Sequence, residues 1–271
     1  MYVFVCHDDP DSIFTAIYDA WASRLGHKNI RILAKEPENY ELFCEYIHVT
    51  TDAEKSRKVA DTIRRRLGSA ASQILFQAVM ADESGIAGSG RRSSSSSFSI
   101  TKADALYRTL LLAFSMEHPE RVLECLGNPY VLYLFELSRS VQNEAHHLLG
   151  FLRFKELRSG ILFSEIHPKN DVLPILGEHF CDRLPQENFM IYDGTRKLAL
   201  IHRAGSFDFL IADASTLDHN LIQNYSDSEL EYQKLWCGFF ESITIEARKN
   251  PALQNQNIPK RFQKDTVEFQ N

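Results

Sequence analysis

The sequence predicts an α+β protein with an N-terminal α/β segment, a helical middle, and a small antiparallel sheet that carries a helix on one face and is followed by a C-terminal helix. Short apolar strands alternate with amphipathic helices over residues 1–83. Helical periodicity then dominates residues 101–149, and a β-α-β-β-β rhythm follows up to residue 211. A Ser- and Gly-rich run at 84–99 predicts a flexible linker or loop before a second domain at 100–271. The two parts can also pack as one unit.

Composition narrows the class of protein. The chain has 271 residues, 44% of them hydrophobic and 24% charged, which is typical of a globular protein. Its net charge of −6 excludes a surface that is positive throughout, so any nucleic-acid contact needs a local basic patch. No apolar run reaches the roughly 20 residues that span a bilayer, and the opening MYVFVCHDDPD has no basic leader. We therefore expect a cytoplasmic protein without membrane contact.

The five cysteines are widely spaced. They match neither a disulfide framework nor a CxxC-type zinc or iron–sulfur site, so we expect reduced, mostly packed thiols.

The N-terminal segment reads as alternating strands and helices, with Asp11 as the predicted cap of the first helix. No glycine-rich turn follows the first strand, which excludes a dinucleotide-binding or P-loop site. The predicted strands are Tyr2–Cys6, Ile30–Leu33 and Cys44–Val49, and the predicted helices are 11–25, 52–67 and 70–80.

The second part begins with helices and ends with a sheet and a further helix. A long helix at 130–149 ends at Gly150, and the helix at 170–183 is capped by Asp171 or Asn170. The predicted strands are 160–166, one from about Phe189, 198–202 and 207–211, the last two forming a hairpin. The closing helix at 225–248 is expected to pack through Leu230, Leu235, Phe239, Ile243 and Ile245.

Several polar clusters could carry chemistry. Arg139, Gln142, Asn143 and His146 share one side of the long helix, with Arg153 just beyond it, and could hold an anion or a base edge. An ordinary solvated helix face is the favoured alternative. Asp8, Asp9 and Asp11 could hold magnesium or serve as turn and cap residues. His167 and His179 lie near acids at spacings that match no metal motif, so no metal site is predicted.

The C-terminal segment 248–264 is basic inside an acidic chain. It holds five Lys or Arg residues and no acid, together with Asn250, other amides and Phe262. Cations for phosphates, amides for base edges and a ring for stacking are what a nucleic-acid contact needs, although a solvated tail is an open alternative. The helix at 55–66 is a second basic surface. No GxSxG or other catalytic motif is present.

Long strings in the second part resemble one family: EAHHLLGFLRF, GILFSEIHPKNDVLPILGEHFCDRL, NFMIYD with Arg196, and W-x3-F-x2-I-x2-EARKNP-x2-Q-x4-PKRF. They are similar to a bacterial DNA metabolism protein family that is described as a domain of unknown function. Its genes lie beside a DNA modification or repair radical SAM protein, and some members are fused to a uracil-DNA-glycosylase-family domain. The resemblance covers about residues 100–264, and the matched polar positions are His146, Arg153, Glu165, His179, Asp193, Arg196, Arg248, Asn250, Lys260 and Arg261.

The resemblance implies a DNA-binding accessory protein that works with the radical SAM partner in bacterial DNA repair or modification. The iron–sulfur cluster and S-adenosylmethionine are then expected on the partner, with no cofactor in this chain. Phosphates would be neutralised by Arg153, Arg196, Arg248, Lys260 and Arg261, with Asn250 beside them, while His146 and Asp193 would contact a base.

Two other classes are open. The chain could be a DNA-processing enzyme that uses His146, Glu165 or Asp193 as acid–base groups. It could also be a protein–protein adaptor that docks the radical SAM protein through helices 130–149 and 226–248.

Overall fold

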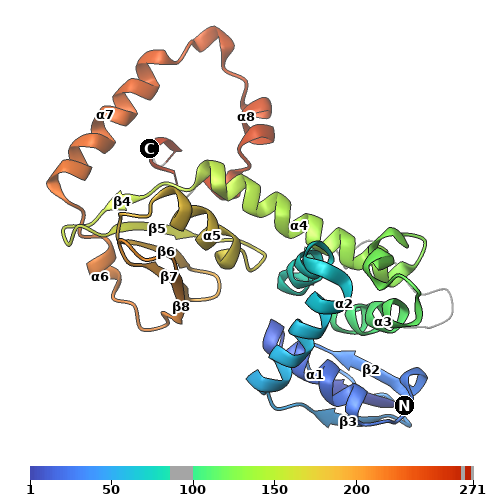
Figure 1. Ribbon diagram of the computed structural model, residues 1–271. Coiled ribbons are helices and arrows are strands. Elements are labelled where there is room, and N and C mark those ends of the chain that lie inside the picture. Colours follow the sequence, from blue (N-terminus) through green and yellow to red (C-terminus); the bar gives the residue numbers. More distant parts are fainter. Residues whose placement is uncertain (86–99, 264–265, 270–271) are drawn as a thin grey trace. The chain divides into compact units, whose positions relative to one another are not determined.

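A computed structural model describes residues 1–85, 100–263 and 266–269 of the chain (Figure 1). The chain forms two compact units, Met1–Gln142 and Asn143–Asn271, and the boundary falls within helix α4 (Pro129–Phe151). The predicted fold class is confirmed, with an α/β opening, a helical middle and a small sheet of mostly antiparallel strands. Apart from its first two residues, the predicted linker at 84–99 lies outside the described residues.

The first unit opens with a parallel sheet in the order β2-β1-β3, made of β1 (Tyr2–Val5), β2 (Ile30–Leu33) and β3 (Glu45–His48). Helix α1 (Pro10–Ala22) connects β1 to β2. Its cap is Asp9 rather than the predicted Asp11, since the Asp9 side chain accepts a hydrogen bond from the Ser12 amide at 2.9 Å. Pro10 favours this start because it has no N–H to leave unpaired in the first turn.

The helices of this unit pack around buried leucines and isoleucines. Helix α2 (Ala53–Met80) contains the two predicted helices, which meet at Gly68, where φ 82° and ψ 169° interrupt the helical backbone. Glycine tolerates this conformation because it has no Cβ. Helix α3 (Lys102–Ser115) follows, and a 3-10 turn, η4 (Pro119–Glu124), precedes α4. Fully buried side chains include Ile63, Leu75, Leu106, Leu110 and Leu134.

The second unit holds a five-stranded sheet in the order β4-β5-β6-β7-β8. The β5/β6 pair is parallel and the other three pairs are antiparallel. β5 and β6 are parallel because the crossover through α5 (Leu173–Arg183) returns the chain to the end of the sheet at which β5 begins. The strands are β4 (Lys155–Glu156), β5 (Leu162–Ile166), β6 (Phe189–Asp193), β7 (Leu198–His202) and β8 (Phe209–Asp213).

Each face of this sheet has its own cover. Helix α5 packs at Gly177 against Leu200 and Phe209, and the other face holds a cluster of Phe163, Tyr192 and Ala199 with Ile222 of helix α6 (His219–Ile222). The residue at the α5 N-cap is Val172, which makes no side-chain cap. The predicted caps Asn170 and Asp171 lie before it, and Asn170 instead donates to Glu144.

The C-terminal part leaves the sheet through α7 (Asp227–Ile243), η5 (Glu246–Arg248), α8 (Pro251–Asn257), α9 (Lys260–Gln263) and η6 (Val267–Phe269) (Figure 1). The predicted helix at 225–248 is shorter in the structure, since α7 ends at Ile243 and Ile245 precedes η5. The prediction that its apolar residues pack is wrong, because Leu230, Leu235, Phe239, Ile243 and Ile245 are 43–67% exposed. The predicted end of the long helix at Gly150 is also wrong, since α4 continues to Phe151. Gly150 lies on the exposed side of α4, so the helix can continue through it without losing a contact to another part of the protein.

We predict that Gly177→Ala destabilises the protein by about 1–3 kcal/mol, because the added methyl would lie 2.6 Å from Leu200 Cδ1 and 2.8 Å from the Phe209 ring. Gly238→Ala is the matched control, since its methyl would meet no atom within 4 Å on the exposed helix α7. Alanine favours a helix over glycine, so the control should be neutral or stabilising. Urea denaturation measures the free energy of unfolding of both variants. Equal destabilisation of the two would contradict the close packing of α5 on the sheet.

Candidate functional site

The C-terminal basic segment and the end of α7 line a hollow of about 800 Å³ in the second unit, with Arg248, Lys249 and Asn250 in its lining. Asn250 caps α8, its Oδ1 accepting from the Leu253 amide at 3.1 Å, and Pro251 begins the helix. Arg248 and Lys249 are exposed, and Lys249 pairs with Glu246 at 2.5 Å. Gln254 and Asn257 line the same hollow, so the structure brings Arg248, alone among the five predicted phosphate-binding cations, together with the predicted amides. Glu241 and Glu246 line the hollow as well.

The two basic residues of α9 differ in what they contact. Arg261 binds Glu144 of α4, with 2.8 Å between Arg261 Nη1 and Glu144 Oε1, and the Glu144 side chain is 2% exposed. Its guanidinium also lies 4.4 Å from the centre of the Phe262 ring, which packs against His147 and Phe151. Lys260 is exposed, and within the described residues it makes no ion pair. Arg261 therefore anchors α9, while Lys260 faces solvent.

Glu144 is the centre of a buried polar network. Its two oxygens accept hydrogen bonds from the Lys169 amide at 3.1 Å, the Asn170 amide at 2.7 Å and the Asn170 side chain at 2.7 Å, in addition to Arg261. The network joins α4, the segment before α5, and α9. The four donors compensate a carboxylate that would otherwise be costly to bury.

Asp193 and Arg196 form a second structural pair. Asp193 is fully buried and accepts from the amides of Thr195 and Arg196 at 2.9 and 3.1 Å. Arg196 Nη1 lies 3.1 Å from Asp193 Oδ2, and the guanidinium also donates to the carbonyls of Pro168 and Lys169. These contacts hold the turn after β6 against the segment before α5. Both residues were candidates for DNA contact, and their side chains are engaged within the protein.

The three acid–base candidates do not gather on one surface of the sheet. Ile166 of β5 lies opposite Asp193 of β6, so the preceding residue, Glu165, points to the other face. Glu165 lies 3.5 Å from His167 Nε2, and both are partly exposed. His146 is exposed on α4. His179, exposed on α5, meets the Phe180 ring edge to face.

The N-terminal aspartates are all engaged with neighbours. Asp8 pairs with Lys102 at 2.5 Å and Lys35 at 3.2 Å, Asp9 caps α1, and Asp11 accepts from Ser56 at 2.6 Å. Desolvation raises the pKa of the nearby Cys6 thiol to about 12, and Asp9 and Asp8 add to the shift. Over the described residues, no group of three His, Cys, Asp or Glu side chains could hold a metal ion. The predicted cap role is thus confirmed for Asp9, while Asp8 forms ion pairs and Asp11 accepts a side-chain hydrogen bond.

A family model for DUF4130, a domain of unknown function, matches residues 101–268. The chain belongs to the DUF4130 family. The match covers more than half of the chain and includes the sheet, α7 and the basic segment. A comparison with curated proteins finds no match. In the described ranges, no helix is both long and apolar enough to cross a bilayer.

Within the DUF4130 match, sequence reasoning overlooked a surface along α7. Arg153, Phe154, Tyr232, Trp236 and Phe239 line a hollow of about 580 Å³. Arg153 Nη1 donates to the carbonyls of Gly150 and Leu152 at 2.9 and 3.2 Å, at the C-terminal end of α4, where a cation is favourable. The aromatic residues of this helix were the sequence signal for an exposed surface, but we assigned them to a hydrophobic core.

Glu144 was overlooked as well. It lies beside Ala145 on the apolar stripe of α4, and an acid at such a position is a sign of a buried, paired carboxylate.

We predict that Glu144→Ala destabilises the protein by about 3–5 kcal/mol, because it leaves buried donors and Arg261 without their acceptor. Glu178→Ala, at an exposed position of α5, is the control and should change the free energy of unfolding by less than about 0.5 kcal/mol. Chemical denaturation gives both values. A Glu144 variant as stable as the control would show that the network does not anchor α9.

Proposed function

We propose that this DUF4130 protein is a cytoplasmic DNA-binding accessory protein in bacterial DNA repair or modification that works with a radical SAM partner. The observation that carries the proposal is the exposed basic segment, in which Arg248 lines one hollow together with Asn250 and neighbouring amides. The acids of that hollow are Glu246, which Lys249 binds, and Glu241. Cations hold phosphates, while amides can reach base edges or sugars. The role in repair and the partner rest on the family resemblance described above.

The geometry separates two groups among the proposed phosphate contacts. Arg196 and Arg261 bind buried carboxylates, so they shape the fold around the site. Arg248 and Lys260 are exposed, and Arg153 is partly exposed. The phosphate contacts therefore fall to Arg153, Arg248 and Lys260, and their small number predicts moderate affinity with a clear salt dependence.

A second candidate function is a protein–protein adaptor, and the surface of α7 favours it. No residue of this helix is buried, and Tyr232, Leu235, Trp236, Phe239 and Ile243 recur at helical spacing with 44–68% of each exposed. Its N-terminus is fixed to the sheet, since the Ser226 amide donates to Glu156 O at 3.0 Å and the Glu156 amide to Glu229 at 3.1 Å. A positioned helix with an exposed apolar stripe is suited to bind a partner groove. The partner that we propose for it is the radical SAM protein.

We predict that the double variant Arg248→Ala/Lys260→Ala binds DNA several-fold more weakly and lowers the slope of log K against log salt by about 2, since each lost phosphate contact removes nearly one unit. The matched control is Arg183→Ala/Arg203→Ala, which removes two exposed cations elsewhere in the same unit. Fluorescence anisotropy with labelled DNA at several salt concentrations measures both. An equal loss of DNA affinity in the control variant would indicate that binding depends on the net charge of the protein and not on these two positions.

We also predict that Leu235→Asp/Phe239→Asp abolishes co-purification with the radical SAM protein, because the charges interrupt the apolar stripe of α7. Both residues are more than half exposed, so stability should change by no more than about 0.5 kcal/mol each. Lys234→Asp places one carboxylate on a neighbouring exposed position as the control. Retention of the partner by the double variant would exclude α7 as the docking surface.

A further inference from the structure

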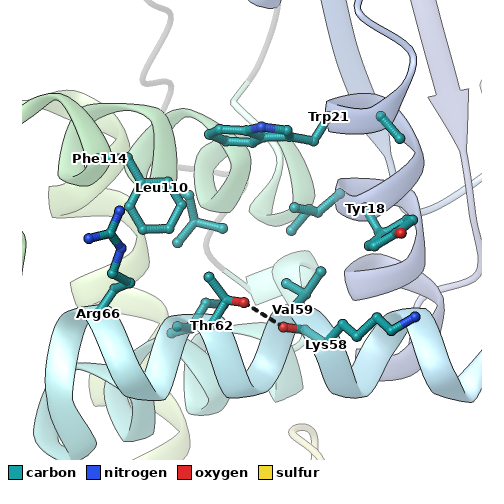
Figure 2. A pocket seen from close by; sticks show the side chains of 11 residues that line it. Tyr18, Trp21, Lys58, Val59, Thr62, Arg66, Leu110 and Phe114 are labelled. Atoms are coloured by element: carbon teal, nitrogen blue, oxygen red, sulfur yellow. Dashed lines mark hydrogen bonds between the residues drawn. The ribbon is translucent and has the colours of Figure 1, made fainter.

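The first unit contains an aromatic hollow of about 470 Å³ between α1, α2 and α3 (Figure 2). Trp21 lies across one side of it, Val59 and Thr62 of α2 form the opposite side, and Phe114 of α3 lies beside them. The hollow lies largely outside the part of the chain that the DUF4130 model matches. The function proposed for the second unit does not use this hollow.

Ring contacts fix the Trp21 indole in place. Its ring meets Phe114 at 5.6 Å and Tyr107 at 6.3 Å, both edge to face, and His27 at 4.9 Å. Trp21 nevertheless remains 38% exposed. An indole that is held by neighbouring rings while it lines an open hollow is a rigid surface on which a flat ring can stack.

The charge of the hollow comes from α2 alone. Arg66 and Lys58 line it, eight residues or about 12 Å apart along the helix. Arg66 lies 5.9 Å from the centre of the Phe114 ring, and among the described residues it has no carboxylate partner. Lys58 binds Glu54 at 2.8 Å, yet this pair is more than half exposed and so is weak. The described lining includes no acid.

The occupant should therefore be a flat ring that carries negative charge on both sides. The polar groups are few, since Thr62 Oγ1 already donates to Lys58 O at 2.7 Å, so recognition would depend on stacking and charge rather than on a hydrogen-bond pattern. Stacking on an aromatic residue with nearby cations is how proteins bind single-stranded nucleic acid with little sequence preference. Arg57, Arg64 and Arg65 add positive potential along the same helix, while Lys55 is paired with Asp19 at 2.8 Å.

We propose that this hollow binds an unpaired base of single-stranded DNA, which stacks on Trp21 while Arg66 and Lys58 contact its flanking phosphates. The inference rests on the proposed DNA-binding function and adds to it a preference for single strands. A base inside a duplex is stacked on its neighbours and cannot enter, unless it is flipped out.

Indole fluorescence tests the site directly in the full-length protein. Titration with single-stranded oligothymidine should quench the wild-type signal, and a duplex of the same length should quench it much less. The chain has two tryptophans, so Trp236→Phe, which leaves Trp21 as the only indole, should keep the quench. Trp21→Phe, which keeps a ring but removes this indole, should lose the part of the quench that Trp236→Phe keeps. Trp21→Ala should weaken oligothymidine binding about 10- to 100-fold, the range found for removal of one stacking ring.

The charge in the hollow is tested by Arg66→Gln, which should weaken binding and lower the salt slope by about 1. Arg64→Gln is the matched control, since it lies on the same helix, is exposed and does not line the hollow. Circular dichroism confirms that each variant is folded.

One outcome would overturn this inference and leave the proposed function standing. In that outcome DNA binding is salt-sensitive, it does not quench the indole, and its affinity is the same in Trp21→Ala and Arg66→Gln as in the wild type. The same inference fails if thymidine monophosphate or a fatty-acid anion quenches as strongly as the oligonucleotide, because the hollow would then take a small free anion. Absence of any DNA binding would overturn both proposals.

Discussion

The arrangement of the second unit depends on one buried carboxylate, that of Glu144. A lone charge in this position would cost several kcal/mol, so four donors from two segments, the stretch before α5 and helix α9, must reach it. Two of the donors come from Asn170 and one from Arg261, which brings α9 back to α4. Phe262 then packs beside His147 and Phe151 and is almost fully buried. The polar network and the ring cluster together fix where the C-terminal segment returns to the fold.

The C-terminal segment is anchored to the fold at the start of α7 and again at α9, which explains why the residues between these two points are exposed. The start of α7 is tied to β4 through Ser226 and Glu229, and α9 is tied to α4 through Arg261. The chain leaves the sheet along α7 and returns through α8 (Figure 1). Residues of α7, η5 and α8 are not buried, so their apolar and basic side chains remain accessible. This accessibility underlies both functions that we propose for the unit.

The protein uses its cations in two ways. Arg196 and Arg261 compensate buried carboxylates and so contribute to the fold. Arg66, Arg248 and Lys260 remain exposed, without a carboxylate partner in the described part of the chain. In a chain with a net charge of −6, few cations are left for a polyanion, and each is a distinct experimental target.

The sequence by itself determined the local elements, because hydrophobic periodicity, caps and turn residues act over only a few positions. It located the strands Ile30–Leu33 and Leu198–His202, the break between two helices that falls at Gly68, and the α+β order. Only the tertiary structure decided which faces are covered. The stripe of α7 has the periodicity of a core helix and is exposed, while Glu144 and Asp193 have the chemistry of surface acids and are buried. Burial depends on contacts between residues far apart in the chain, such as Glu144 with Arg261, or Trp21 with Phe114, and no local pattern encodes those pairings.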